Sequence, residues 1–319
     1  MTPTTQAPRS AVIVNPVRVE DLPARRRLVD SALAEAGWPA PTWLETTRQD
    51  PGTGQARQAV GDGAEGVFVC GGDGTVRAVI EGLAGTDAAL AILPAGTGNL
   101  LATNLGIPDD PVAGVQVAVE MGRRRIDVGD VDGQAFAVMA GIGFDAALLD
   151  DASTTLKARL GPVAYVLSAL RHVLDRRMDL EIRLDDREVL HRRARAVVVG
   201  NVGRLQGGVR LLPDAEPDNG QMEVAVLAPH GLHQWLATVH GVLWRHRHVA
   251  HLEVHRAARI QVLSDRDHPR QLDGDVVGPG RSLTVTVRPS ALLLCVPQPE
   301  LSPDMSEGSD RLGGDAGRP

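Results

Sequence analysis

A run of glycines around one aspartate is the part of this sequence best suited to chemistry. The run consists of Gly71, Gly72, Asp73, Gly74 and Thr75. It follows an apolar segment that is typical of a buried strand and precedes a segment with helical spacing. Glycines let the backbone approach a ligand closely, and the amides at a helix N-terminus suit a phosphate. The run therefore predicts a phosphate-binding turn at the start of a helix.

The aspartate inside this turn needs an explanation of its own. A carboxylate beside phosphates is repulsive unless it holds a metal ion or accepts a proton. Asp73 can also act as a helix cap, because aspartate is common in tight turns and at helix starts. From the local pattern, a chemical role and a capping role both remain open.

A second glycine turn follows the next apolar segment along the chain. It runs from Pro94 to Asn99 and contains Gly96, Thr97 and Gly98. In α/β folds, ligands usually bind outside the carboxyl ends of the strands. Two such turns after two strands of one sheet predict a shared crevice, which is a stronger signal than either turn alone.

The elements around these turns alternate between strand and helix. We predict strands at 11–14, 41–47, 66–70 and 90–93, one helix opened by Asp21 and Pro23 and stopped by Gly37, and another helix from about residue 76. This alternation predicts a layered α/β domain with a mostly parallel sheet.

The pattern changes near residue 125, after which short strands dominate. They are expected at 126–131, 135–140, 180–184, 189–199, 221–227, 259–263, 282–287 and 291–296. Helical insertions are expected at 154–174 and 232–249. This half favours a β-sandwich or a flattened barrel. We therefore divide the chain into an α/β domain (1–125), a β-rich domain (126–298) and a disordered tail (299–319).

Composition excludes several classes of protein. The formal net charge of -7 argues against a dedicated nucleic-acid binder. No apolar run approaches the roughly 20 residues that span a bilayer, and the N-terminus lacks the apolar core of a signal peptide. Cys70 and Cys295 lie in apolar runs, so we expect buried free thiols and a cytoplasmic location. Lys157 is the only lysine and no P-loop motif is present, so phosphates would be held by backbone amides, arginine and metal.

Together these segments resemble the diacylglycerol kinase catalytic domain family. The resemblance covers most of the chain, and its landmarks occur in the family's order. They are Asn15-Pro16, Gly71–Thr75, Pro94–Asn99, Gly141–Ala146, Lys157–Tyr165, Pro213–Ala215 and Gln271–Gly274. The resemblance implies an N-terminal nucleotide-binding domain like that of NAD kinases and diacylglycerol kinases, followed by a β-sandwich-like domain.

The resemblance also implies a reaction and a set of binding residues. The chain would transfer the γ-phosphate of ATP to a lipid hydroxyl, with Mg²⁺ and with diacylglycerol as the leading acceptor. The lipid would be reached by peripheral contact with the inner face of the membrane, and homodimer formation is left open. The residues implied for ATP are Asn15, Pro16, Thr46, Gly71, Gly72, Asp73, Gly74, Thr75, Gly96, Thr97 and Asn99.

On the acceptor side, the family pattern implies further roles. Gly143, Phe144 and Asp145 would line the lipid headgroup. Asp73, Asp273 and Asp275 would form an acidic cluster. One of these carboxylates would accept the hydroxyl proton, and the others would orient Mg²⁺ or the nucleophile, because phosphoryl transfer needs mainly alignment and charge neutralisation.

The sequence departs from the family pattern at two places. Many bacterial members carry glutamate where Asp275 stands, so the carboxylate here is one methylene shorter. The segment 216–221 resembles a structural Mg²⁺ loop, but a neutral asparagine replaces the usual aspartate before the glycine, which weakens a metal site. The candidate ligands are Glu216, Asp218, Asn219 and Gln221.

Two other functions remain open at this stage. NAD kinases share the Gly-Gly-Asp-Gly-Thr signature, although their second motif usually contains an Asn-Glu pair and here Leu100 follows Asn99. A nucleotide-binding regulator without turnover is the other candidate, because Asp275 and Asn219 both depart from the pattern.

Several weaker motifs also have competing interpretations. The spacing of Gly141, Gly143 and Ala146 fits a dinucleotide fingerprint formally. His246, His248 and His251 have a spacing compatible with zinc, although a solvated face is the simpler account. The arginines at 123–125 are either solvated or phosphate contacts. The apolar stripe at 232–243 is either core or a membrane-surface helix.

Overall fold

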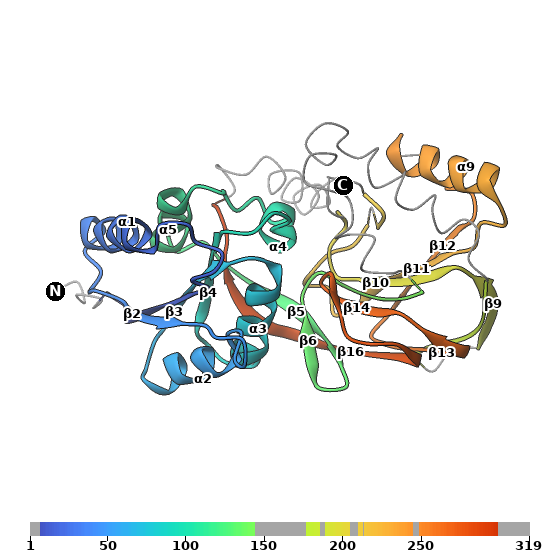
Figure 1. Cartoon of the computed structure of the whole chain (residues 1–319), viewed down its shortest axis with the longest axis horizontal. Helices are drawn as coiled ribbons and strands as arrows, with labels where there is room; N and C mark the ends of the chain where they lie inside the picture. Colours follow the sequence, from blue (N-terminus) through green and yellow to red (C-terminus); the bar gives the residue numbers. More distant parts are fainter. Residues whose placement is uncertain are drawn as a thin grey trace, which may run out of the picture. The chain divides into compact units, whose positions relative to one another are not determined.

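The computed structural model describes residues 7–143, 177–185, 189–204, 210–212, 214–244 and 249–298 (Figure 1). The chain forms two compact units. Unit 1 comprises residues 1–125 together with the chain from Leu292 onward, and unit 2 comprises Ile126–Ala291. The predicted helix at 154–174 and the landmark Lys157–Tyr165 lie outside the described residues.

Unit 1 is built on a parallel sheet, as predicted. Its strands run in the order β2-β1-β3-β4, and the end of β16 pairs with β4 through Leu293 and Ala89. The bounds are β1 (Ser10–Val14), β2 (Thr42–Glu45), β3 (Gly66–Gly71), β4 (Ala89–Pro94) and β16 (Gly280–Cys295). Every residue of β1, β3 and β4 is buried, as expected for parallel strands covered on both faces.

Five helices accompany this sheet among the described residues. They are α1 (Leu22–Glu35), α2 (Thr53–Gly61), α3 (Asp73–Leu83), α4 (Leu100–Asn104) and α5 (Pro111–Val119). Asp21 caps α1 by accepting a hydrogen bond from the Ala24 amide, which confirms the predicted start. The second predicted helix begins earlier than expected, because the last residues of the first glycine turn already form the first turn of α3. The sequence patterns did not reveal α2, α4 or α5.

Both cysteines are buried free thiols, as predicted. Burial raises the pKa of each thiol, and raises the pKa of Cys295 to about 11. The folded state therefore disfavours the reactive thiolate. For Cys295, the free energy of unfolding therefore falls as the pH rises from 9, the ordinary thiol value, to about 11, because the unfolded chain loses the thiol proton first.

We expect neither thiol of the folded protein to react appreciably with iodoacetamide at pH 8, and both to react in denaturant. Mass spectrometry of alkylated protein measures this directly. Cys295→Ala serves as the control, since it leaves one reactive thiol after unfolding. Rapid double alkylation of the native chain would contradict the burial.

Unit 2 is a β-sandwich, in agreement with the predicted fold class. One sheet has the order β12-β11-β10-β7-β14-β15, and the other contains β16-β13-β8-β9 with β5 and β6. The bounds are β5 (Arg123–Val131), β6 (Gln134–Phe136), β7 (Met139–Ile142), β8 (Met178–Leu184), β9 (Leu190–Ala194), β10 (Ala196–Gly200), β11 (Met222–Leu227), β12 (Leu252–Ala257), β13 (Arg259–His268), β14 (Arg270–Leu272) and β15 (Asp275–Val276).

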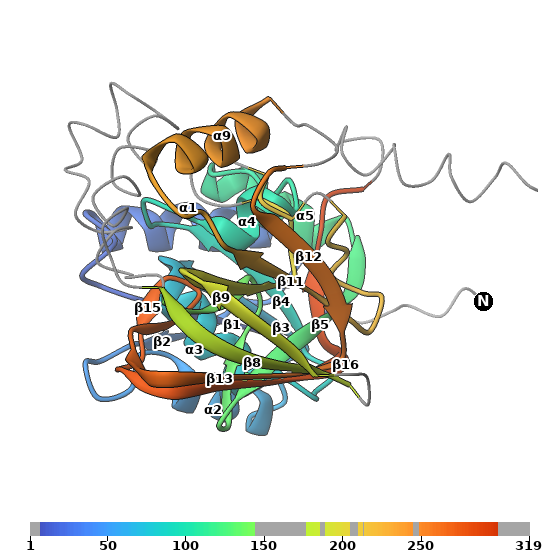
Figure 2. The ribbon, with the colours of Figure 1, turned by 90° about the vertical axis from the view of Figure 1, so that its right-hand side faces the viewer.

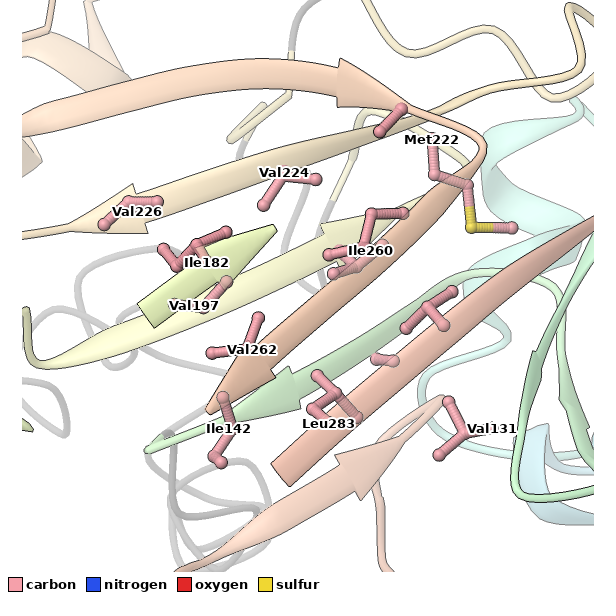
Figure 3. Close-up of a cluster of buried hydrophobic side chains, with 14 of the residues drawn as sticks. Val131, Ile142, Ile182, Val197, Met222, Val224, Val226, Ile260, Val262 and Leu283 are labelled. Atoms are coloured by element: carbon pink, nitrogen blue, oxygen red, sulfur yellow. The ribbon is translucent and has the colours of Figure 1, made fainter. Parts of the chain in front are cut away.

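Aliphatic side chains from both sheets meet in the core of unit 2 (Figure 3). Ile182 and Ile260 come from one sheet, and Val197 and Val224 from the other; all four are fully buried. Along β8, buried positions alternate with more exposed ones. This alternation is typical of a strand with one face on the core and one toward solvent.

Two segments predicted as single strands are each split in the structure. The segment 135–140 breaks between β6 and β7, because the amides of Ala137 and Val138 donate to the Asp273 carboxylate instead of to the carbonyls of a neighbouring strand. The segment 189–199 breaks at Arg195, where β9 in one sheet gives way to β10 in the other. An apolar run in the sequence gives no sign that the chain passes from one sheet to the other.

The helix predicted at 232–249 is shorter than expected. It is observed as α9 (Leu232–Leu243), which lies outside the layer of β11 and β12, on the side away from β8 and β13 (Figures 1 and 2). Trp244 forms its C-cap. No helix in the described parts of the chain is long and apolar enough to cross a membrane.

Candidate functional site

The predicted nucleotide residues of unit 1 follow the carboxyl ends of its parallel strands. Asn15 follows β1, Thr46 follows β2, and Thr75 lies one helical turn beyond β3. The Asn15 side-chain amide donates to the Thr75 hydroxyl over 3.0 Å. The Thr46 backbone amide donates to the Val14 carbonyl over 2.9 Å, and the Thr46 side chain is buried. The fold thus brings these polar groups to one edge of the sheet, as expected for a ligand site.

The two glycine turns are in direct contact. A methyl group added at Gly96 would lie 2.6 Å from the Gly72 Cα atom, closer than real contacts allow. The Ala95 amide also donates to the Gly71 carbonyl over 3.0 Å. The absence of side chains at Gly72 and Gly96 is therefore what lets the turns pack together.

Asp73 bridges the two turns. One carboxylate oxygen accepts a hydrogen bond from the Asn99 amide over 3.0 Å, and the other accepts from the Leu100 amide over 2.7 Å. Both amides stand at the start of α4, so Asp73, which itself belongs to α3, caps α4. This is a third role beside those considered from the sequence, and it explains how a carboxylate is tolerated in the turn.

The N-cap of α3 is Gly72, which has no side chain with which to cap the helix. Backbone amides at an uncapped helix start are suited to phosphate oxygens, because they are donors and carry the positive end of the helix dipole. The first glycine turn does lie at the start of a helix, as expected, and phosphate binding there stays a prediction.

Asn99 closes the second turn from inside. Its side-chain oxygen accepts from the Gly96 amide, and its side-chain nitrogen donates to the Gly96 carbonyl, both over 3.1 Å. Its backbone has a φ of 45°, a conformation that asparagine tolerates better than most residues. Thr97 lies at the exposed tip of this turn.

We expect Gly96→Ala to raise the KM for ATP at least tenfold, because the new methyl group forces the two turns apart. Steady-state kinetics with varied ATP measures this change. Gly61→Ala is the matched control, since a methyl group there meets nothing within 4 Å. An unchanged KM for Gly96→Ala would show that contact between the turns does not matter for nucleotide binding.

In unit 2, two of the predicted acids lie at one hairpin turn. Asp273 and Gly274 connect β14 to β15 with φ values of 49° and 92°, which is the pattern of a two-residue type I′ turn. The Asp273 carboxylate is buried and accepts hydrogen bonds from three consecutive amides, those of Ala137, Val138 and Met139, over 2.8–3.0 Å. It therefore holds the connection between β6 and β7.

Asp275 differs from Asp273 in its surroundings. It stands on β15 opposite Leu272 and is half-buried. The three predicted acids are thus divided between the units, with Asp73 in unit 1 and both Asp273 and Asp275 in unit 2.

The predicted headgroup residues are only partly described. Gly143 follows β7 with a φ of 82°, and a methyl group there would lie 2.5 Å from the Arg195 carbonyl oxygen. Phe144 and Asp145 lie outside the described residues. Gly141 lies within β7, between antiparallel partners β10 and β14, so this glycine spacing does not belong to the parallel βαβ unit of a dinucleotide fingerprint.

The loop that resembles a Mg²⁺ site is held by hydrogen bonds within the protein. Asp127 accepts from the Gly220 amide over 2.6 Å, and its own amide donates to the Pro217 carbonyl over 2.6 Å. The Asn219 side-chain oxygen accepts from the Gln221 amide over 2.9 Å. Within the described ranges, no three His, Cys, Asp or Glu side chains come together as a metal site. The metal site at Glu216, Asp218, Asn219 and Gln221 stays a prediction, and we assign no step to a metal ion there.

The structure reveals supporting residues that the sequence patterns did not identify. Asp127 is fully buried and also accepts from the Ser290 amide over 2.7 Å. The buried Asn201 side chain donates to the carbonyls of Asp127 and Ala137. The only available signal was a charged residue inside the apolar strand pattern at 126–131.

A second supporting pair, Glu223 and Arg256, anchors the residues on either side of the loop 216–221. Burial raises the pKa of Glu223, and Arg256, at 3.0 Å, opposes that rise. Arg256 also donates to the Asp214 carbonyl over 3.2 Å.

The arginines at 123–125 are engaged locally: Arg123 donates to the Ala118 carbonyl, and Arg125 pairs with Asp87.

Comparison with known proteins places both units. Residues 9–131 match the model of the diacylglycerol kinase catalytic domain, and residues 137–296 match the YegS C-terminal NAD kinase beta sandwich-like domain. The chain belongs to the family of lipid kinases that combine these two domains. This kinase is therefore a phosphotransferase, and the predicted family resemblance is confirmed.

Individual relatives agree with the family models. This kinase is 34% identical over 254 residues to a Pseudomonas aeruginosa protein named "Probable lipid kinase YegS-like", covering 75% of this chain and 79% of the relative. It is 28% identical over 286 residues to a diacylglycerol kinase of Staphylococcus saprophyticus, covering 87% and 92%. A crystal structure of a diacylglycerol kinase from Bacillus anthracis shares the fold, with a TM-score of 0.75, 23% identity and coverage of 93% and 99%.

Proposed function

We propose that this kinase transfers the γ-phosphate of ATP to the hydroxyl of diacylglycerol and so produces phosphatidic acid. The observation that carries the proposal is the pair of touching glycine turns bridged by Asp73 at the carboxyl edge of the unit 1 sheet. The named diacylglycerol kinase of S. saprophyticus, which aligns with most of the chain, supports the choice of lipid.

In this proposal, ATP enters as its Mg²⁺ complex, and the ion belongs to the substrate. The amides of the first turn of α3 bind the phosphates. Asn15 and Thr75, joined by their side-chain hydrogen bond, keep the polar edge of the sheet in shape beside them. Thr46 adds a polar contact from the neighbouring strand. Positioning and charge neutralisation supply most of the catalysis in phosphoryl transfer.

We assign the proton acceptor to Asp275. Asp275 stands on β15 beside the hairpin turn, at the position of the family's last acidic residue. The carboxylates of Asp73 and Asp273 accept two and three backbone amides, and we give both a positioning role. The lipid hydroxyl oxygen forms a bond to the γ-phosphorus while its proton passes to Asp275. The bond from the γ-phosphorus to the β–γ bridging oxygen breaks, and ADP leaves.

The proposal is tested with purified protein, ATP labelled in the γ-phosphate and Mg²⁺, with acceptors supplied in mixed micelles. The acceptors are diacylglycerol, monoacylglycerol, a sphingoid base and phosphatidylinositol, with NAD added in a separate reaction. We expect label in phosphatidic acid. Label only in another lipid would keep the kinase and overturn the choice of acceptor. Label in NADP would favour the NAD kinase alternative, and ATP binding by calorimetry without any transfer would favour the regulator.

A further inference from the structure

Helix α9 presents an uncovered face in unit 2. Its inner face is buried through Trp235, Thr238 and Val242, which recur at helical spacing. The outer face carries the exposed side chains of His233, Leu236, Ala237, His240 and Trp244. We call these five residues the α9 face. The helix lies at the periphery of its unit, outside β11 and β12 (Figures 1 and 2).

Two large apolar side chains in the α9 face are exposed to solvent. Leu236 is 48% exposed and Trp244 is 64% exposed. The Trp244 ring is also stacked on the His240 ring, with centroids 4.3 Å apart and planes 14° apart. This stacking holds an indole outward on a defined surface. Exposed indoles on a preformed surface are typical of binding sites and of the interfacial region of membranes.

The charge of the surrounding sequence indicates what the face binds. From Val224 to Leu252 the chain contains no aspartate or glutamate, although the whole protein contains 40 acidic residues and has a net charge of -7. The same stretch contains two arginines and six histidines. Among the described residues, Arg177 lies 3.0 Å from His230, and Arg195 donates to the Pro229 carbonyl over 2.9 Å, so cationic side chains stand just before α9. An acid-free stretch with cationic neighbours on an acidic protein is complementary to an anionic partner.

We propose that the α9 face docks on the surface of an anionic phospholipid bilayer, with Trp244 and Leu236 inserted at the headgroup boundary. Indole and leucine side chains gain free energy there, and the cationic surroundings add attraction to anionic lipids. A second copy of the chain fits the charge pattern poorly, because a two-fold contact would bring identical cationic stretches together. The inference extends the proposed function, whose acceptor resides in a membrane, and names the surface that reaches it.

The test is sedimentation with sucrose-loaded vesicles of phosphatidylcholine containing phosphatidylglycerol, and with vesicles of phosphatidylcholine alone. We expect the wild-type protein to bind the anionic vesicles more strongly. Replacing both Trp244 and Leu236 with alanine lowers the partition coefficient roughly tenfold or more, and Ala237→Glu lowers it through charge. Leu28→Ala is the matched control, since Leu28 is also 48% exposed on a helix but belongs to unit 1.

A spectroscopic reading accompanies the binding measurement. Trp38 and Trp235 are buried, and the Trp43 indole donates to Asp30, so Trp244 is the tryptophan most exposed to solvent. Its emission shifts to shorter wavelength with anionic vesicles, and Trp244→Phe loses that shift. Thermal unfolding of each variant shows whether it is folded.

Equal vesicle binding by wild type and the double alanine variant would overturn the inference, as would no binding by wild type. A change from dimer to monomer in the double variant during sedimentation velocity would instead make the α9 face an interface between copies. A short-chain, monomeric diacylglycerol separates this inference from the proposed function. The double variant phosphorylates it at the wild-type rate and loses activity only on vesicles. If wild type binds vesicles through α9 but phosphorylates no lipid, only the proposed function fails.

Discussion

Asp73→Asn lowers kcat/KM for lipid phosphorylation at least roughly 100-fold. The wild-type carboxylate accepts amides from both Asn99 and Leu100. Asparagine keeps one acceptor oxygen but turns an NH₂ group toward the other amide, so one bond becomes a repulsion. Because Asn99 also closes the second glycine turn through Gly96, both turns shift, and small misplacements of a reacting phosphate cost about 100-fold in rate.

The fold survives this change. The free energy of unfolding falls by about 1–2 kcal/mol, the usual cost of one lost charged hydrogen bond, and urea titration measures it. Asp21→Ala is the matched control. It removes the carboxylate that caps α1 in the same unit, so it lowers stability by about 1 kcal/mol and leaves kcat/KM unchanged. If Asp73→Asn keeps more than a tenth of the activity, the role given to the bridge is wrong.

Asp275→Asn and Asp273→Asn fail in different ways. Asp275→Asn removes the proposed proton acceptor and lowers kcat by about 10²- to 10⁴-fold, the usual contribution of a general base. Asp273→Asn turns an NH₂ group toward a set of three backbone amides. It lowers the free energy of unfolding by about 2–4 kcal/mol.

A conservative variant separates these two roles. Asp275→Glu restores the carboxylate and retains transfer. A collapse of kcat in well-folded Asp273→Asn, with Asp275→Asn fully active, would move the proton acceptor to Asp273.

The sequence predicted the features that arise from regular local patterns of residues. Apolar runs located β1, β3 and β4, and Asp21 with Pro23 located the start of α1. Glycine spacing predicted that two turns share one edge, and the contact between Gly72 and Gly96 agrees with it. These features depend on neighbours in sequence or on the regular geometry of a parallel sheet, so a pattern is enough to reveal them.

Long-range hydrogen bonds were out of reach of such patterns. Asp73 caps a helix that begins 27 residues later, and Asp127 accepts from Ser290 across 163 residues. The carboxylate of Asp273 joins residues more than 130 positions apart. An aspartate that accepts hydrogen bonds from distant backbone amides looks the same in the sequence as an aspartate that reacts with a ligand. The sequence alone could therefore not separate the two roles.

The last strand has a consequence for how the protein is made. Because Leu293 and Leu294 in β16 pair with β4, the parallel sheet of unit 1 lacks this strand until residues 293 and 294 have left the ribosome. Residues 1–125 therefore leave the edge of β4 open while all of unit 2 is translated. An unpaired, apolar strand edge is a site of aggregation, so the nascent N-terminal half is the stage at which a chaperone would matter most.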